Sequence, residues 1–498
     1  MALVVRGGEV LRGDPPALAR ADVLVEGDRI ADVGPAVTAP SGTEAVDATG
    51  CLVVPGLVNA HTHGHNILLR GLADRWTLED LLNHGPGLNA NRTAEDHYVG
   101  AALNAVEMLR TGCTAAYELF MTAPAPTIDD LDAVARAYAD VGMRAVVAPA
   151  VADVVFWDAI PGLVELLPKE LRRRVEGVRT TPTATLLKLG DDAISRLHGS
   201  AGGRIRVSIA PTIPTQCTDG FLEGCARQMR EHGVGVHTHL AESKVQAIAA
   251  QRRWGKTAVE RLGDLGLLGP NFVGAHGVWL TDEDIRRLAD AGAAVAHNPA
   301  SNLRLGNGIA AVREMLDGGL TVGLGTDGSM SSDNQNLFEA MRLAGIVSNI
   351  RFPHLTDRWV SATEVWRMAT LGSARAIGLG DELGAIERGR YADLVLLRGD
   401  GTCLRPRSDV AGSLVYVESG SDVDTVIASG RVVVRGGRVL TVDEARLRDR
   451  AQEAADRLRR ENMAGWAMAA ELAPYLSTAC RAAALTPYPV NRYAAPVP

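Results

Sequence analysis

Eight apolar, strand-like runs within residues 51–376 constrain the fold of this chain more than any other feature. The runs are CLVVPGLVNA, CTAAYELF, RAVVAPAV, IRVSIAPTI, GVGVHTHL, NFVGAHGV, AAVAHN and TVGLGTDG. Helix-period segments such as TAEDHYVGAALNAVEMLRTG separate most neighbouring runs. Strands that are apolar almost throughout are typical of a parallel sheet buried on both faces. The pattern predicts an α/β fold, a (β/α)8 TIM-like barrel, with a six-stranded doubly wound sheet as the alternative.

The two ends of the chain differ from the middle. Short β-prone pieces broken by glycine occupy residues 1–50 and return in GRYADLVLLRGD and VDTVIASGRVVVRGGRVL. We expect these flanks to pair into one small composite β-sheet domain beside the barrel. The expected division is 1–55 and 378–442 for the two parts of the composite sheet, 56–377 for the barrel, and 443–498 for a C-terminal helix and tail.

Two segments exceed what a minimal barrel needs. Residues 152–203 are longer than a usual connection, and we expect them to form an insertion after the third strand, near the barrel mouth. Residues 443–473 are rich in arginine and alanine and predict an amphipathic helix. The tail 474–498 is rich in Pro, Tyr and Ala, and we expect it either to drape over another surface or to stay loose.

Composition excludes several classes of protein. The 498 residues are 46% hydrophobic and 22% charged, which is typical of a globular chain. The net charge of −8 argues against a nucleic-acid or anionic-membrane surface. Six scattered cysteines form no CxxC motif, and we read no signal peptide and no membrane span. We therefore expect a cytoplasmic protein with reduced thiols that acts on a small molecule.

Half of the twelve histidines lie at the ends of predicted strands. Together with one aspartate, these strand-end residues are His61, His63, His237, His239, His276, His297 and Asp327. Residues two apart on a strand point to the same face, so His61 and His63 aim in one direction. Catalytic residues of barrels lie at the C-terminal strand ends, and imidazole with carboxylate suits Zn²⁺ or a similar ion. The pattern predicts a metal centre there.

These residues lie in sequence pieces that resemble the amidohydrolase superfamily. The resemblance is to the branch of cyclic-amidine deaminases and triazine hydrolases, which includes guanine deaminase and S-adenosylhomocysteine deaminase. From Pro55 to Ser329 the matching pieces are PGLVNAHTH, RGLAD, HTHLAES, AHGVWL, HNPASNLRLGNGIAAV and GLGTDGS. They are highly specific for the superfamily and much less specific for a substrate. The resemblance also implies the composite sheet and a homo-oligomer.

The resemblance implies a role for each residue of the centre. The implied metal ligands are His61, His63, His239 and Asp327. Glu242, three residues after His239, matches a proton-shuttling glutamate, and His276 matches the histidine that orients the reacting carbon or the attacking water. Asp327 would also take the proton of that water. His237 matches a supporting position.

One divalent transition metal ion is implied for each chain. Two-metal members of the superfamily use a carboxylated lysine at the fourth strand end, whereas the corresponding run RIRVSIAPTIPTQC contains no lysine. Zinc is preferred for the histidine-rich ligand set, and iron fits the same ligands.

Further residues are candidates for binding substrate: His65, Trp76, Glu118, His297, Ser301 and Asn302. Ser301 and Asn302 match a pair close to the pocket, without a fixed role. For His65 the start of the next helix is the slightly favoured alternative, and for Trp76 and Glu118 packing or a solvated rim explains them at least as well. Where nucleoside-handling relatives carry a Glu–Trp pair, this chain has Asp80 and Leu81, which puts ribose binding in doubt.

The leading functional hypothesis is a metal-dependent hydrolase that deaminates a small nitrogen heterocycle of purine, pterin, pyrimidine or triazine type. Glu242 supports it, because deamination of an amidine needs a proton on the ring nitrogen. The first alternative is hydrolysis of another C–N or C–halogen bond, such as an amide, urea or triazine substituent. A non-catalytic barrel scaffold is less favoured, because the whole presumed machinery is present.

Overall fold

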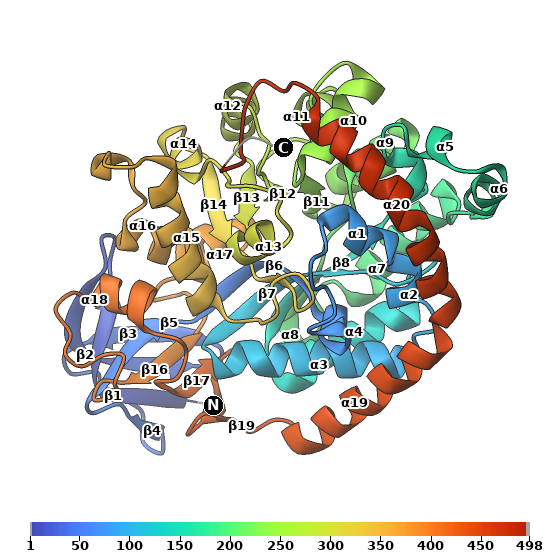
Figure 1. The fold of residues 1–498 in the computed structure, drawn as a ribbon. Helices are drawn as coiled ribbons and strands as arrows, with labels where there is room; N and C mark the ends of the chain where they lie inside the picture. Colours follow the sequence, from blue (N-terminus) through green and yellow to red (C-terminus); the bar gives the residue numbers. More distant parts are fainter. Residues whose placement is uncertain (1, 495–498) are drawn as a thin grey trace.

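The computed structural model describes residues 2–494, in which a mixed sheet joins both flanks of the chain (Figure 1). Its nine strands follow the order β19–β18–β17–β16–β5–β1–β2–β3, with β4 beside β1. The N-terminal strands are β1 (Ala2–Arg12), β2 (Ala17–Glu26), β3 (Arg29–Gly34), β4 (Glu44–Asp47) and β5 (Cys51–Pro55). The C-terminal strands are β16 (Leu394–Arg398), β17 (Val423–Ala428), β18 (Arg431–Arg435) and β19 (Arg438–Val439). The flanks meet where β5 pairs antiparallel with β16.

Two parallel sheets carry the remaining apolar runs. The first has the order β10–β8–β7–β6–β15, with β9 beside β8. Its strands are β6 (Leu57–His63), β7 (Cys113–Phe120), β8 (Arg144–Val151), β9 (Ile205–Val207), β10 (Ala210–Pro211) and β15 (Asp327–Gly328). The second contains β11 (Val236–Leu240), β12 (Phe272–His276), β13 (Ala294–His297) and β14 (Thr321–Leu324). All residues of β6, β7 and β8 are buried, which explains why these strands are apolar almost throughout.

The two parallel sheets approach each other on both sides. An isolated parallel bridge joins Ile209 to Val236, and the His239 amide donates to the Thr212 carbonyl at 2.8 Å. On the other side β14 is followed directly by β15, which pairs with β6. The mixed α/β fold with parallel sheets is as predicted. The first predicted run is divided, however: CLVVP belongs to the mixed sheet as β5, and only the strand from Leu57 joins the parallel one.

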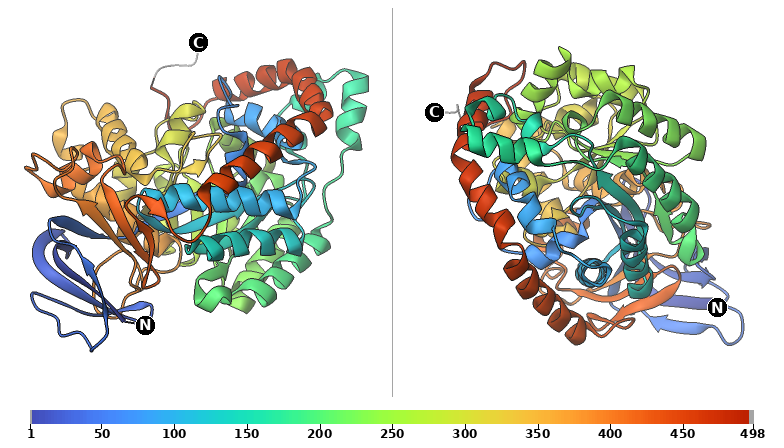
Figure 2. Two further views of the ribbon diagram at one scale, coloured as in Figure 1. Left: turned by 90° about the horizontal axis from the view of Figure 1, so that it is seen from below. Right: turned by 90° about the vertical axis from the view of Figure 1, so that its right-hand side faces the viewer.

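Helices cover the outer face of the parallel strands (Figures 1 and 2). The longer ones are α3 (Ala94–Arg110), α4 (Ile128–Val141), α7 (Thr183–Leu197), α9 (Asp219–His232), α10 (Lys244–Trp254), α12 (Asp282–Asp290) and α15 (Leu337–Arg351). Three of them begin at a capping box, in which Thr93, Thr127 or Thr281 exchanges hydrogen bonds with an aspartate three residues later. None of the helices within residues 2–494 has the length and apolar character that a membrane crossing requires.

Short helices lie over the C-terminal ends of the parallel strands. After β6 come η1 (Gly64–Leu69), α1 (Leu78–Asn83) and α2 (Gly85–Asn89). After β8 come η2 (Phe156–Ala159), α5 (Leu163–Leu166) and α6 (Lys169–Gly177). The insertion expected over 152–203 therefore ends earlier, because α7 packs against α4 and α9 as part of the outer helical layer.

The C-terminal segment forms two helices, α19 (Glu444–Glu461) and α20 (Met463–Leu485), which run along one side of the molecule (Figure 2). The prediction of a helix ending at 473 was too short. α20 continues through Pro474 because Leu472 and Leu476 pack in one apolar cluster with residues of η2, α5 and α6. The tail drapes over the strand-end loops, where the Arg492 guanidinium donates to the Leu280 carbonyl at 2.7 Å.

Leu472 tests how firmly α20 is held. Its side chain is fully buried, whereas that of Leu485 on the same helix is 53% exposed. We expect Leu472→Ala to lower the free energy of unfolding by about 2–5 kcal/mol, because it leaves a cavity in this cluster. Leu485→Ala is the matched control and should change it by less than about 0.5 kcal/mol. Urea denaturation of both variants measures the difference, and equal values would contradict the packing.

Candidate metal centre

Side chains from four strands converge at the C-terminal ends of the parallel sheets. His61 and His63 come from β6, His239 from β11, His276 from β12 and Asp327 from β15. The Oδ1 atom of Asp327 lies 3.3 Å from Nε2 of His61 and 3.3 Å from Nε2 of His63. Ligand atoms of His61, His63 and His239 lie within 4.8 Å of one another, as do those of His61, His276 and Asp327. The structure thus brings together the four residues that the sequence suggested as ligands.

Strand register explains this convergence. Asp327 is paired with Thr62 in the parallel ladder, which places its carboxylate between the two neighbouring histidines of β6. Asp327 and His276 both have left-handed backbone conformations, with φ of 58° and 72°. Such conformations are uncommon for non-glycine residues and occur often at functional sites.

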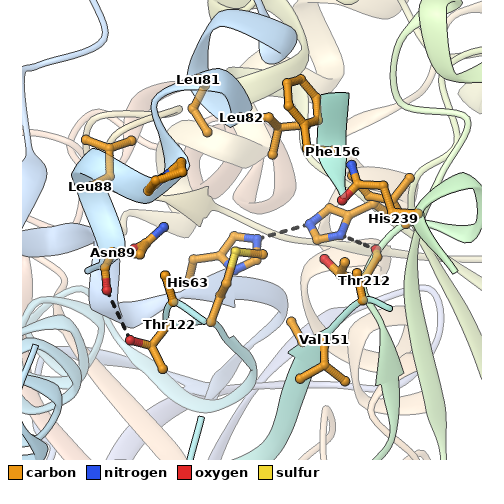
Figure 3. A pocket seen from close by; sticks show the side chains of 18 of the residues that line it. His63, Leu81, Leu82, Leu88, Asn89, Thr122, Val151, Phe156, Thr212 and His239 are labelled. Carbon is orange, nitrogen blue, oxygen red and sulfur yellow. Dashed lines mark hydrogen bonds between the residues drawn. The ribbon is translucent and has the colours of Figure 1, made fainter. Parts of the chain in front are cut away.

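Backbone carbonyl groups fix how two of the histidines are presented. Nδ1 of His63 donates to the Leu119 carbonyl and Nδ1 of His239 donates to the Thr212 carbonyl, both at 2.6 Å. Their Nε2 atoms therefore carry lone pairs, and these atoms face each other at 3.1 Å (Figure 3). Neither nitrogen of the buried His61 has a hydrogen-bond partner. A divalent cation among these lone pairs satisfies them, so the donor set fits a metal ion.

The protonation states suit a cation. Burial lowers the pKa of His61 to about 3 and holds the pKa of His239 well below its usual value. Burial alone would raise the pKa of Asp327, but the close approach of His61, together with the neighbouring His63 and His276, holds it well below its ordinary range. These shifts favour neutral imidazoles at His61 and His239 and a carboxylate at Asp327, the forms in which such residues bind metals.

Glu242 lies in the turn between β11 and α10, beside this cluster. Its side chain is 1% exposed, and its Oε1 accepts a hydrogen bond from the Asn307 amide at 3.0 Å. Oε2 lies 3.5 Å from Nε2 of His276. Burial, together with the nearby Asp327 and Glu79 carboxylates, raises the pKa of Glu242 well above its usual value. The raised pKa favours the protonated carboxyl group, which is the form that can donate a proton.

His276 is oriented from its far side. Its Nδ1 donates to Oδ1 of Asn302 at 2.9 Å, which leaves Nε2 as the acceptor that faces Glu242. An imidazole in this tautomer orients a water molecule by accepting its hydrogen. Asn302 thus contacts His276 and is not one of the residues that line the cavity above the centre.

A cavity of about 450 Å³ opens above the cluster (Figure 3). Three of the proposed ligands line it: His63, His239 and Asp327. His65 and Glu242 line it beside them. Sequence reasoning did not find most of its other walls, which include Leu81, Leu82, Leu88, Asn89, Phe156, Gln216 and Met330. These residues lie in short helices and loops, where neither a sequence motif nor a regular spacing of apolar residues identifies them. The unusual length of the connection after β8 was the one sequence feature that pointed to them.

Of the six residues suggested to bind substrate, His65 is the one that lines the cavity. Trp76 instead stacks on His84, with ring centroids 4.1 Å apart. His297 and Ser301 are buried among the strand ends without lining the cavity.

Glu118 lies behind the cavity. Both of its oxygens accept from the Gly64 amide, at 2.8 and 2.9 Å, and Oε2 also accepts from the Tyr138 hydroxyl at 2.6 Å. Glu118 therefore anchors the turn that follows His63. Its hydrogen bonds to Gly64 and Tyr138 hold the carboxyl group away from the opening of the cavity.

Comparison with known proteins decides the family. The profile of the Amidohydrolase family matches residues 52–433. The chain belongs to this family. Among curated amidohydrolases, 5′-deoxyadenosine deaminase of Methanosarcina mazei is 35% identical over 92% of this chain and 98% of its own length. The 5-methylthioadenosine/S-adenosylhomocysteine deaminase of Desulforudis audaxviator is 36% identical over 88% and 94%. The superfamily resemblance is confirmed.

Two solved structures resemble this amidohydrolase over nearly its full length. Atrazine chlorohydrolase from Arthrobacter aurescens, complexed with zinc, has a TM-score of 0.82 at 29% identity and covers 91% of this chain and 100% of its own. An adenosine deaminase from Xanthomonas campestris with bound zinc has a TM-score of 0.79 at 27% identity and covers 92% and 98%.

Metal content tests the ligand set. We expect about one equivalent of a divalent transition metal per chain after extensive dialysis, measured by elemental analysis. His239→Ala should lose the metal and the activity, because it removes one ligand of the ion. His232→Ala is the control, because His232 is exposed and pairs with Asp191. This variant should retain the metal and the activity. Two tightly held equivalents in the wild type would contradict a mononuclear centre.

Glu118 makes a prediction about pH and stability. Burial raises its pKa from 4.5 to about 7, although the Tyr138 and Gly64 donors oppose the shift. The folded state therefore favours the protonated form, so this stabilising contribution is complete below pH 4.5 and is lost as pH rises through 7. We expect the stability of the wild type relative to Glu118→Gln to fall by up to about 3 kcal/mol between pH 4.5 and 7. Urea denaturation at several pH values measures it; a difference that rises with pH would show that the carboxylate is stabilised when ionised.

Proposed function

We propose that this amidohydrolase deaminates an aminated nitrogen heteroaromatic ring, with one metal ion held by His61, His63, His239 and Asp327. The observation that carries this proposal is the buried carboxyl group of Glu242 beside the ligand cluster, with its Oε2 3.5 Å from Nε2 of His276. Burial raises the pKa of this group and favours its protonated form. A proton donor so close to a set of metal ligands suits a reaction that must protonate a ring nitrogen while water attacks the adjacent carbon.

The chain supplies each proton transfer. When bound, the metal ion lowers the pKa of a coordinated water and so provides the nucleophile at neutral pH. His276 Nε2 accepts a hydrogen bond from the attacking water, and Asp327 accepts its proton. Glu242 donates its proton to the ring nitrogen, the tetrahedral carbon forms, and the proton held by Asp327 passes to the amino group. The C–N bond breaks and ammonia leaves, while the hydroxyl proton of the tetrahedral carbon returns to Glu242, so that the ring keeps the oxygen as a carbonyl group.

The relatives support this proposal. The curated amidohydrolases described above are named as deaminases of 5′-deoxyadenosine and of methylthioadenosine or S-adenosylhomocysteine. Zinc is bound in both solved neighbours, which supports zinc as the preferred metal, and iron fits the same donor set. An enzyme explains the intact site better than a non-catalytic scaffold does.

The same proposal extends to the barrel and its assembly. We propose that the two parallel sheets close into one eight-stranded barrel through the Ile209–Val236 bridge and the β14–β15 segment. The division into domains at 55, 377 and 442 stays a prediction, as does the homo-oligomer.

A second candidate function is displacement of another leaving group, such as a halide or an alkylamine, from a triazine-type ring. The likeness to atrazine chlorohydrolase favours it, because the metal ligands and a protonated carboxyl group serve that substitution as well.

Glu242→Gln tests the proposed deamination. We expect the variant to keep the metal and the fold and to lose turnover by about 10²–10⁴-fold, because an amide cannot supply the proton. Metal content, circular dichroism and ammonia release by the same preparation give the comparison. Glu223→Gln, at an exposed position on α9, is the matched control and should behave as wild type. Near-full activity of Glu242→Gln would exclude ring protonation by this residue.

A further inference from the structure

The residues that line the cavity indicate which substituent the heteroaromatic ring of the substrate bears. We infer that the substrate is an aminated heteroaromatic ring with an uncharged apolar substituent, an alkyl, cycloalkyl or aryl group, in place of a sugar. This inference rests on the proposed function, because it assumes that the amino group lies at the metal centre. It narrows the substrate beyond what the family and the catalytic residues specify.

Charged groups in the cavity are confined to the reaction centre and the rim. Among the described residues that line it, the two carboxyl groups are those of Glu242 and Asp327. Arg179 is the one lining guanidinium; it is exposed and donates to the Glu176 and Val178 carbonyls. A substituent bound between the centre and the rim meets no fixed charge.

The carboxylates of the neighbouring helix α1 point elsewhere. Glu79 accepts a hydrogen bond from the Ser243 hydroxyl at 2.6 Å, and Asp80 accepts from the amide and hydroxyl of Thr77 at the start of the helix. Neither residue lines the cavity. No acidic side chain of the described lining is therefore placed to bind a sugar diol away from the metal centre.

Apolar side chains form the walls instead. Leu81, Leu82 and Phe156 lie on one side of the His63–His239 pair and Val151 lies on the other (Figure 3). Trp157 also lines the cavity, and its indole N–H donates to Asn83 at 2.8 Å, so the ring offers the substrate an apolar surface. Hydroxyl groups placed against such walls lose water without gaining partners, which disfavours their binding.

The polar atoms that remain suit a ring better than a sugar. The hydroxyls of Thr122, Thr180 and Ser331 already donate to protein oxygens. The uncommitted atoms are few: the Thr212 hydroxyl and Oδ1 of Asn89 are buried without a partner, and no side-chain hydrogen bond joins Gln216 to another residue within 2–494. A few neutral amides in an apolar cavity are typical of sites that orient a heteroaromatic ligand.

Cavity size supports a substituent of several carbons. A volume of about 450 Å³ lies in the range of sites for drug-sized ligands. A bare ring would leave much of this space to water against leucine and phenylalanine side chains. Filling it with apolar groups releases that water and strengthens binding in proportion to the area buried.

A chain-length series tests the inference on the metal-loaded enzyme. Ammonia release is measured for 9-methyl-, 9-propyl- and 9-butyladenine and, in parallel, for diaminotriazines with methylamino, propylamino or butylamino groups. In whichever ring series reacts, we expect kcat/KM to rise about fourfold per methylene. Adenosine and 5′-deoxyadenosine should fall at least tenfold below 9-butyladenine. Equal or better turnover of either nucleoside, or no dependence on chain length, would overturn the inference.

A pair of leucine variants localises the effect. Leu81→Ser should flatten the dependence of kcat/KM on chain length, because Leu81 lines the cavity beyond the centre. Leu166→Ser is the control, since Leu166 on α5 is 44% exposed and does not line the cavity. A flattened series in the control, or an unchanged one in Leu81→Ser, would contradict binding of the substituent at this wall.

Binding without reaction distinguishes failure of the inference from failure of the proposed function. If no aminated ring releases ammonia, the proposed deamination is wrong, and the same compounds are then compared by their effect on the melting temperature. A rise that grows with alkyl length and exceeds that given by adenosine supports the apolar substituent independently. A larger rise with adenosine or 5′-deoxyadenosine overturns it.

Discussion

The pairing of β15 with β6 is the constraint on which the rest of the site depends. It is two residues long, yet it places Oδ1 of Asp327 3.3 Å from the Nε2 atoms of both His61 and His63. Around this contact His239 arrives from the second parallel sheet and is held by the Thr212 carbonyl of the first. The candidate metal centre therefore also lies at the junction of the two sheets, so the same interactions shape the fold and bring the proposed ligands together.

The cavity is polar at the strand ends and apolar along its remaining walls. Both environments bear on the proposed deamination. The strand ends supply buried imidazoles and carboxyl groups. Burial lowers the pKa of His61 and raises that of Glu242, whereas the neighbouring histidines hold the pKa of Asp327 low. Leu82, Phe156 and other apolar side chains line the cavity above the same groups. In such a low-dielectric space, charge that develops on the substrate interacts strongly with Glu242 and Asp327. The apolar walls thus contribute to chemistry as well as to substrate choice.

Sequence patterns predicted what depends on local period and spacing. The two-residue period of a strand predicted that His61 and His63 point in the same direction. Glu242, three residues after His239, was indicated by the resemblance to the amidohydrolase superfamily. The paired flanks were expected from their shared texture, and β5 and β16 join them. Residues whose placement depends on distant partners were beyond such patterns. Asn307 reaches Glu242 from a loop 65 positions away, and Glu118 is turned inward by Gly64 and Tyr138. The extent of α20 likewise depends on an apolar cluster assembled from remote segments.

The left-handed backbone at Ala241, His276 and Asp327 has a consequence for how this protein can change. Each such conformation costs about 1–3 kcal/mol in a non-glycine residue, which is a sizeable share of the roughly 5–15 kcal/mol that stabilises a typical domain. The fold thus sacrifices stability where it aims His276 and Asp327. Glycine at position 276 or 327 would relieve the backbone strain but would also remove the imidazole or the carboxylate. Selection for stability alone would therefore favour loss of these groups. Ala241 is the exception, since it shares the conformation without carrying a reactive side chain. Stability and catalysis are therefore opposed at two of these turns and separable at the third.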